Sequence, residues 1–190
     1  AGRPCAGPTP MALRKDALLA ATRIMQDVVA AAHRHPPHGR GTVGMVQVFP
    51  NSRNVIPGRV KFSIDLRNST DALVDQMADE VKAFAARVAK DSGLGVQIEL
   101  VSSYPAQIFH NDCIDAVARA AKKLGYSNMP AVSGAGHDAV YMAKLAPSGM
   151  IFIPCKDGIS HNEIEDAKPE HITAGCNVLL HAMLERAGVA

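Results

Sequence analysis

Apolar residues along the first part of the chain recur at the spacing of a helix. Within residues 11–33 they include Leu18, Ile24 and Val28, which fall on one helical face. The stretch that follows contains a Pro-Pro pair and two glycines, which cannot continue a helix. The pattern therefore predicts one amphipathic helix, followed by a loop.

Beyond that loop, apolar and polar residues alternate, which is the period of a half-buried β-strand. Residues 42–49 and 59–67 show this alternation, and the turn-rich stretch between them predicts an antiparallel pair. A second helical pattern over residues 71–90 follows, and residues 95–103 predict a third strand. This α-β-β-α-β order is a ferredoxin-like split β-α-β unit that lacks its first strand.

The last part of the chain shows a different order of patterns. Helical spacing predicts helices over 111–124 and 169–186, with a shorter helix ending near residue 145 between them. Residues 150–154 (MIFIP) are a continuous apolar run, which predicts a strand buried on both faces. Such a strand needs neighbouring strands, and this part of the sequence offers few of them.

Composition and charge narrow the class of protein. Of 190 residues, 47% are hydrophobic and 20% charged, which is typical of a globular chain rather than a disordered one. A formal net charge of +2 gives no basic surface for nucleic acid. No apolar run reaches the roughly 18 residues of a membrane span, and no secretory leader pattern is present, so a cytoplasmic location is expected. The cysteines stand far apart without a C-x-x-C pair, which excludes a zinc knuckle and favours reduced thiols.

Three short segments carry residues suited to chemistry. His161 follows the predicted buried strand, beside Glu163 and Glu165, and could bind a zinc-type metal or be a solvated loop histidine. Residues 133–139 (SGAGHDA) predict either a close backbone approach to a ligand or a tight turn before a helix. The histidine-rich residues 33–38 (HRHPPH) have no matching carboxylate or cysteine, and a surface loop is the better interpretation.

Longer motifs occur in order along nearly the whole chain. They are AGPTPMALRKDA at 6–17, NVIPG at 54–58, FSIDLR at 62–67, SGAGHDA at 133–139 and MIFIPCKDGISHNE at 150–163. Together they resemble the hydantoinase/carbamoylase-type amidases of the dinuclear-metal aminoacylase and aminopeptidase superfamily. This group includes N-carbamoyl-L-amino acid hydrolases and allantoate amidohydrolases, so the resemblance does not fix the substrate.

The resemblance implies an α/β fold class with an α+β lid, in a two-domain enzyme whose catalytic domain is interrupted by that lid. Residues 1–104 would be the ferredoxin-like lid or dimerisation domain without its first strand. Residues 105–190 would be the C-terminal segment of the metal-dependent catalytic domain. The resemblance also implies a homodimer formed through the lid, and two divalent metal ions, Zn or Mn with Co or Ni as alternatives, that assist cleavage of a carbamoyl or ureido C–N bond.

The resemblance assigns roles to individual positions. His161 in GISHNE is expected to be the last metal ligand. Asn54 and Arg67 are expected to reach into the partner subunit's active site and bind the substrate carboxylate, for which an arginine fork and a neutral amide are well suited. Backbone amides near residues 134–136 are a further expected contact to that carboxylate. Cys5 stands where relatives have a histidine that polarises the scissile carbonyl, and a thiol is a weaker donor.

The resemblance also implies that the other metal ligands and the catalytic glutamate lie upstream of these 190 residues. The resemblance therefore implies part of a longer amidohydrolase for N-carbamoyl-L-amino acids or related ureido acids, and this chain alone is expected to be inactive. One alternative is a non-catalytic dimerisation module derived from the lid, and another is an aminoacylase or aminopeptidase relative. We expect a small ureido or carboxylate substrate, with neither nucleic acid nor membrane as a partner.

Overall fold

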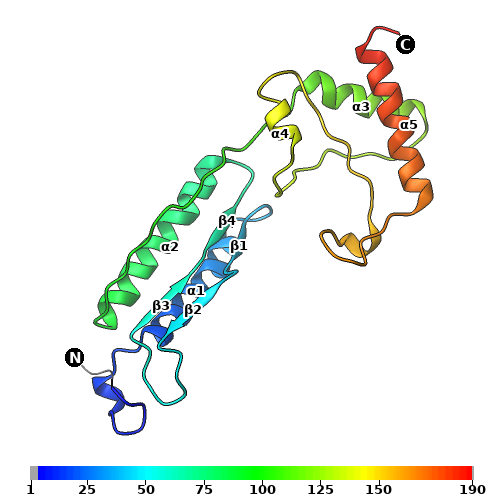
Figure 1. The fold of residues 1–190 in the computed structure, drawn as a ribbon. Coiled ribbons are helices and arrows are strands. Elements are labelled where there is room, and N and C mark those ends of the chain that lie inside the picture. The colour runs from blue at the N-terminus through cyan, green and yellow to red at the C-terminus, as the bar shows by residue number, and fades with distance from the viewer. Residues whose placement is uncertain (1–3, 190) are drawn as a thin grey trace. The chain divides into compact units, whose positions relative to one another are not determined.

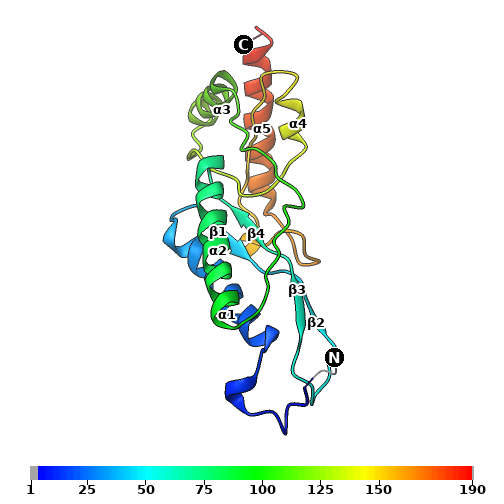
Figure 2. The same cartoon turned by 90° about the vertical axis from the view of Figure 1, so that its left-hand side faces the viewer.

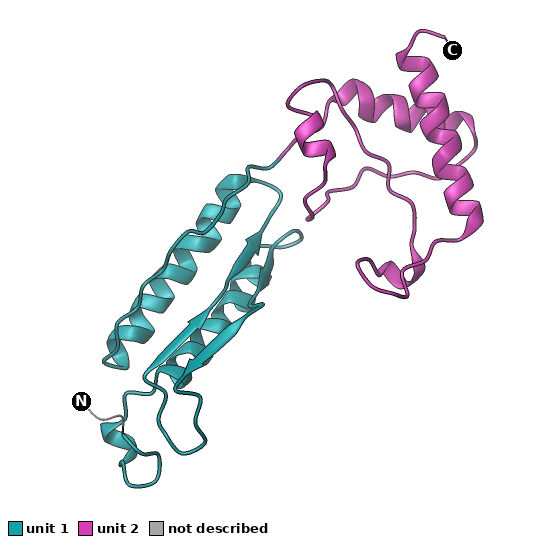
Figure 3. Cartoon of the chain, viewed as in Figure 1, with its two compact units in different colours: residues 1–106 teal, residues 107–190 magenta. Residues whose placement is uncertain are grey.

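The computed structural model describes residues 4–189 and divides into two compact units. The first unit is Ala1–Ala106 and the second is Gln107–Ala190 (Figure 3). The boundary expected from the sequence follows residue 104, and the outer limits of both expected domains fall outside the described residues. No helix in the described part is long and apolar enough to cross a membrane.

The N-terminal helical pattern of the first unit forms two pieces. A single 3₁₀ turn, Met11–Leu13, precedes helix α1, Ala17–Arg34 (Figure 1). The helix begins there because Asp16 Oδ1 accepts hydrogen bonds from the amides of Leu18 and Leu19, at 3.0 and 3.1 Å. The helix therefore begins at Ala17, directly after its capping residue, whereas the apolar pattern predicted a start at residue 11.

The two predicted strands form a long antiparallel pair that is interrupted near its middle. Close to the turn, β2 (Val46–Phe49) pairs with β3 (Arg59–Phe62). Farther from the turn, β1 (Arg40–Thr42) pairs with β4 (Asp65–Arg67). The antiparallel pairing expected from the alternating pattern is confirmed.

Two helices cover one face of this strand pair, and the core of the unit lies between them and the strands. Helix α2, Asp71–Asp91, packs on α1, and both helices contact the strands (Figure 2). Val28 on α1 and Met77 on α2 are fully buried. Phe62 and Leu66 reach this core from alternate strand positions, as the period of two requires.

The third predicted strand, residues 95–103, is not a strand in the structure. These residues are extended and run back along α2 (Figure 1), but they belong to neither strand pair. Their apolar side chains are exposed, with Val101 at 89%. The chain order explains this result, because in a split β-α-β unit the first strand separates the two strands that a helix joins. Without that strand, residues 95–103 have no neighbour with which to form a ladder.

The second unit is built on a pair of helices. Helices α3 (Asn111–Lys123) and α5 (Pro169–Arg186) pack against each other, with the short helix α4 (Ala139–Met142) between them in sequence. Small and β-branched side chains fill the contact between α3 and α5. The buried residues there are Ala116, Ala120, Ala121, Val178 and Ala182.

The prediction of a strand over residues 150–154 is also wrong. Ile151 packs against the α3–α5 contact, but Phe152 is 53% exposed and residues 150–154 form no strand. A strand buried on both faces needs strands on both sides, and within residues 107–189 the structure has none. The apolar run is therefore extended and only partly covered.

Candidate functional site

The loop after residues 150–154 presents His161, the expected metal ligand, to solvent. The loop is closed where the amide of Lys156 donates to the carbonyl oxygen of Asp166 at 2.7 Å. His161 has a left-handed backbone with φ of 57°, and its amide donates to Glu165 Oε2 at 2.8 Å. A residue other than glycine adopts this conformation only where surrounding contacts hold it. The Glu165 contact is therefore part of what positions the imidazole.

The residues around His161 do not by themselves form a metal centre. Glu165 lies close in sequence, but one of its carboxylate oxygens already accepts the His161 amide. Across residues 4–189, no three His, Cys, Asp or Glu side chains gather so that they could hold a metal ion. A catalytic zinc takes three protein ligands, so a metal at His161 would need ligands from beyond the described residues.

The structure brings Cys5 and Asn54 together at the turn end of the strand pair. Cys5 forms an isolated antiparallel bridge with Val55. The amide of Ala6 donates to the Asn54 carbonyl oxygen at 2.8 Å. The residues before α1 thus form a short ladder with the NVIPG segment, and two candidate positions that are far apart in the sequence become neighbours.

Both of these side chains are accessible to a ligand. Cys5 and Asn54 are exposed. Ser52 Oγ donates to Asn54 Oδ1 at 3.0 Å, so the amide oxygen of Asn54 already has a partner. The pair therefore offers the neutral NH2 group of Asn54 and one thiol to the same region of surface.

Arg67 lies at the opposite end of the strand pair, directly across from Arg40 on β1. Its Nε and Nη2 atoms donate to Oδ1 and Oδ2 of Asp65, both at 2.8 Å. This two-point hydrogen bond raises the pKa of the Arg67 guanidinium and lowers the pKa of the Asp65 carboxyl. Asp65 was not among the predicted site residues, although positions i and i+2 of a strand share one face and would have indicated the pair.

Asn54 and Arg67 are too far apart to meet one small ligand within a single copy of the unit. The register places Phe49 opposite Arg59 near the turn and Arg40 opposite Arg67 at the far end. Eight strand steps separate these ends and correspond to roughly 26 Å. A ureido acid is far shorter than that distance.

The SGAGHDA loop forms a compact, exposed turn. Ser133 Oγ and His137 Nε2 are 2.8 Å apart, and the amide of Ala135 donates to Ser133 Oγ at 3.2 Å. The His137 ring meets Phe152 edge-on, with ring centroids 5.5 Å apart. In the described structure His137 bonds to Ser133 rather than to Asp138, which caps no amide of α4. The turn interpretation therefore describes the local geometry, and carboxylate binding by this loop stays a prediction.

The histidine-rich segment contributes to the fold of the first unit. His35 Nε2 is 2.8 Å from Glu80 Oε1, and Arg34 Nε donates to Glu80 Oε2 at 2.9 Å. These contacts tie the end of α1 to α2. The sequence pattern did not predict these contacts, because Glu80 lies 45 residues away from His35 along the chain.

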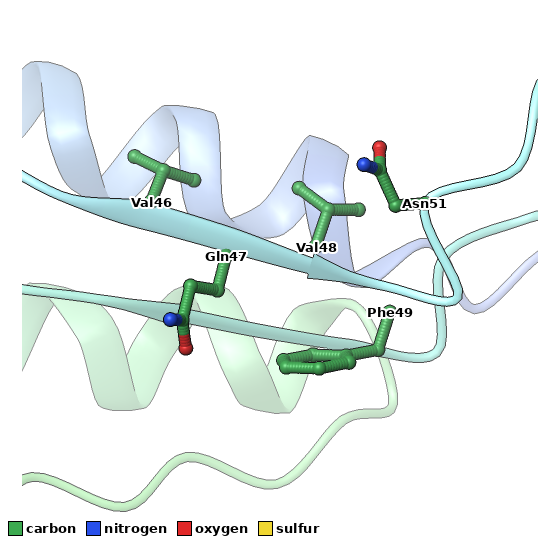
Figure 4. Close-up of a pocket in the computed structure, with 5 residues that line it drawn as sticks. All are labelled: Val46, Gln47, Val48, Phe49 and Asn51. Carbon is green, nitrogen blue, oxygen red and sulfur yellow. The ribbon is translucent and has the colours of Figure 1, made fainter.

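A shallow hollow follows the outer edge of β2. It is lined by Val46, Gln47, Val48, Phe49 and Asn51. Figure 4 shows that these side chains point to both sides of the strand. Since successive residues of a strand face opposite sides, a hollow lined by all of them lies along the strand edge itself. Within residues 4–189 β2 pairs with β3 and with no other strand, so its outer edge exposes backbone groups that can pair with another strand.

The sequence has close relatives of greater length. Residues 16–185 match the family model described as peptidase family M20/M25/M40. The chain is 44% identical over 183 residues to an N-carbamoyl-L-amino-acid amidohydrolase of Rhizobium meliloti, and 36% identical over 182 residues to an N-carbamoyl-L-amino acid amidohydrolase of Geobacillus stearothermophilus. Each comparison covers 96% of this chain and 44% of the relative. The chain therefore spans less than half the length of these relatives.

Solved structures show the same relationship. A hydantoinase/carbamoylase family amidase from Burkholderia multivorans has a TM-score of 0.92 and 53% identity, and the comparison covers 98% of this chain and 45% of that one. A hydantoinase/carbamoylase family amidase from Burkholderia ambifaria also has a TM-score of 0.92, with 43% identity over 100% of this chain and 45% of the other.

Proposed function

The chain belongs to peptidase family M20/M25/M40, and from this premise we propose that it is part of a metal-dependent amidohydrolase. The resemblance to hydantoinase/carbamoylase-type amidases is confirmed by the relatives in sequence and structure. The proposed reaction cleaves the carbamoyl or ureido C–N bond of an N-carbamoyl-L-amino acid or a related ureido acid. The observation that carries it is the 44% identity over 183 residues, a span that necessarily includes Asn54, Arg67 and His161.

His161 would be one ligand of a pair of divalent metal ions, Zn or Mn, with Co or Ni as alternatives. When bound, such a pair polarises a carbonyl group and supplies a nucleophilic water. The contribution of this chain would be an exposed imidazole on a closed loop, oriented in part through the bond from its amide to Glu165. The other ligands would come from residues beyond this chain.

Replacing His161 with alanine tests this assignment in a polypeptide that joins this chain to the region supplying the other ligands. We expect bound metal to fall and turnover of N-carbamoyl amino acids to be lost, because a ligand is removed. His33→Ala is the matched control, since His33 is exposed at the end of α1 and belongs to no proposed site. Normal metal content and turnover in His161→Ala would remove the residue from the centre.

We infer that the working enzyme is a homodimer formed through the first unit. A single substrate carboxylate can meet both Asn54 and Arg67 only if they come from two copies, because roughly 26 Å of strand separates them in one copy. The exposed edge of β2 supports such an assembly, since it offers unpaired backbone groups. Cys5 would lie beside Asn54 at the same ligand, where its thiol polarises a carbonyl less than an imidazole would.

Arg67→Ala should raise KM for carboxylate-bearing substrates about 10- to 100-fold, the cost of a lost charged hydrogen bond. The matched control is Arg40→Ala, because Arg40 lies directly across the strand pair and its side chain donates to the nearby carbonyl oxygens of Pro37 and Gly39. Steady-state kinetics with a substrate and its amide analogue separate carboxylate binding from a general loss of activity. Unchanged KM in Arg67→Ala, or full activity in a monomeric enzyme, would contradict this arrangement.

A non-catalytic dimerisation module is a second candidate, and the free edge of β2 favours it. Metal analysis, light scattering and a carbamoylase assay distinguish the two in a polypeptide that joins this chain to the region supplying the other ligands, because the 190-residue chain alone is expected to be inactive in both cases. A metal-free, inactive dimer of the joined polypeptide supports the module, whereas two metals per polypeptide with turnover support the enzyme. An aminoacylase or aminopeptidase relative would instead cleave N-acyl or peptide substrates in a panel and spare the ureido acids.

A further inference from the structure

Residues 4–13 form the loop that leads into α1, drawn in dark blue in Figure 1, which we call the entry loop. The Ala6 amide of this loop donates to the Asn54 carbonyl oxygen at 2.8 Å. From the other side, the Ile56 amide donates to the Pro4 carbonyl oxygen at 3.1 Å. The Ile56 side chain is buried, which anchors the NVIPG segment in the first unit, whereas no residue of the entry loop is buried. The entry loop therefore depends on polar contacts to keep its shape.

The side chain of Arg14 supplies two of these polar contacts. Its Nε atom donates to the Thr9 carbonyl oxygen at 3.0 Å, and its Nη2 atom donates to the Ala6 carbonyl oxygen. The Thr9 hydroxyl in turn donates to the Cys5 carbonyl oxygen at 2.7 Å. The planar fork of a guanidinium fixes two acceptors relative to each other, which a single ammonium donor does not do. Arg14 therefore holds the part of the loop that includes Cys5.

The position of Arg14 in the chain connects this loop to the core of the unit. Arg14 lies just before α1, and the first residue of that helix, Ala17, donates its amide to the Pro57 carbonyl oxygen at 3.0 Å. Among residues 4–189, the guanidinium forms no ion pair with a carboxylate, and its acceptors are the two carbonyl oxygens of the entry loop. Its donors are thus directed to the backbone beside Cys5 and Asn54.

We propose that Arg14 is a positioning residue of the amidohydrolase. Its two bonds keep the entry loop on the NVIPG segment, so that the Cys5 thiol and the Asn54 side chain face the same substrate. Arg14 acts through these two residues and does not itself touch the substrate. The inference rests on the proposed function, which places Cys5 and Asn54 at the ligand. The apparent affinity of a site falls with the fraction of molecules in which its binding residues are in place, so loss of Arg14 weakens substrate binding.

The first test measures amide hydrogen exchange in the 190-residue chain, residue by residue by NMR. In Arg14→Ala the Ala6 and Ile56 amides should exchange at least about tenfold faster, because the entry loop opens more often. The Val28 amide in α1 should keep its wild-type rate. Arg23→Ala is the matched control, since Arg23 is exposed on α1, and it should change none of these rates.

Two results of this measurement would overturn the proposal. Wild-type exchange at Ala6 and Ile56 in Arg14→Ala would show that the guanidinium does not hold the entry loop. Equal acceleration at Val28 would show that Arg14 stabilises the whole unit rather than positioning the loop.

The second test is a double-mutant cycle in the polypeptide that joins this chain to the region supplying the other ligands. Arg14→Ala should raise KM for N-carbamoyl amino acids about tenfold when Asn54 is present, and less than about twofold in an Asn54→Ala background. An equal rise in both backgrounds would show that Arg14 does not act through Asn54. If the joined polypeptide with Arg14 intact turns over no ureido acid, the proposed function is contradicted, whereas turnover with an equal rise contradicts this inference alone.

Discussion

The carboxylate of Glu80 ties the end of α1 to α2, and its replacement tests how much this contact stabilises the first unit. Its two oxygens bond to His35 Nε2 at 2.8 Å and to Arg34 Nε at 2.9 Å. The side chains of His35, Glu80 and Arg34 are 9%, 32% and 45% exposed. Glu80→Gln keeps the size of the side chain but removes its charge and leaves one of the two donors without an acceptor oxygen.

The expected loss in the free energy of unfolding is about 1–2 kcal/mol, intermediate between two limiting cases. A hydrogen bond to a charged group contributes about 1.5–3 kcal/mol, and the nearly buried His35 contact is closest to that case. An exposed ion pair contributes about 0.2–1 kcal/mol, and the Arg34 contact is closest to this second case. The His35 contact therefore accounts for most of the expected loss.

The pH dependence gives an independent check. The hydrogen bond from His35, followed by that from Arg34, lowers the pKa of Glu80. A carboxyl whose pKa is lower in the folded state stabilises the fold above its unfolded pKa, and this contribution is lost as pH falls through the folded pKa. The difference between wild type and Glu80→Gln should therefore be complete at pH 7 and shrink below the ordinary carboxyl pKa of 4.5.

Urea unfolding, monitored through hydrogen exchange of the α2 amides, measures the free energy of unfolding of this unit alone. The matched control is Asp79→Asn on the same helix, because Asp79 is 76% exposed and forms an exposed ion pair with Lys82, at 3.0 Å. The control should change stability by less than about 0.5 kcal/mol. If Glu80→Gln changes stability no more than this control, or if its effect grows at acid pH, the reasoning is wrong.

Two further substitutions test the packing of the first unit by the same measurement. Met77→Ala should destabilise the unit by about 2–5 kcal/mol because the side chain is fully buried, whereas Met11→Ala, at a side chain that is 72% exposed, should have little effect. Gly41→Ala should also destabilise it by about 1–3 kcal/mol, because a Cβ there would collide with the carbonyl oxygen of Val28 on α1, while Gly58→Ala meets open space and serves as the control. Equal stability of the two Met variants would show that the Met77 side chain does not stabilise the core. Equal stability of the two Gly variants would show that the close approach of Gly41 to α1 is not needed.

The helices were predictable because their signals are local. Helix α2 runs to Asp91 where the pattern predicted residues 71–90, and α5 matches the predicted 169–186. Thr70 Oγ1 accepts a hydrogen bond from the Leu73 amide, and Pro169 occupies the first turn of α5. A cap and an apolar period of 3.6 involve only residues within a few turns, so no distant partner is needed.

The sequence predicted which residues belong to the candidate site, but it did not predict how they are arranged in space. The motifs singled out Cys5, Asn54, Arg67 and His161, but they did not show that Cys5 and Asn54 share a short ladder. They also did not show that Asn54 and Arg67 lie at opposite ends of the strand pair. These relations depend on hydrogen-bond register, which joins residues that are distant in the sequence.

The amino-acid sequence by itself determined the helices, the segments with an alternating pattern and the family to which the chain belongs. Only the tertiary structure decided which alternating segments become strands. Residues 59–62 and 95–103 both carry a strand-type pattern, yet only the first forms a ladder, with residues 46–49. The physical reason is that a helix satisfies its backbone within one segment, whereas a strand needs a neighbour to accept and donate its hydrogen bonds.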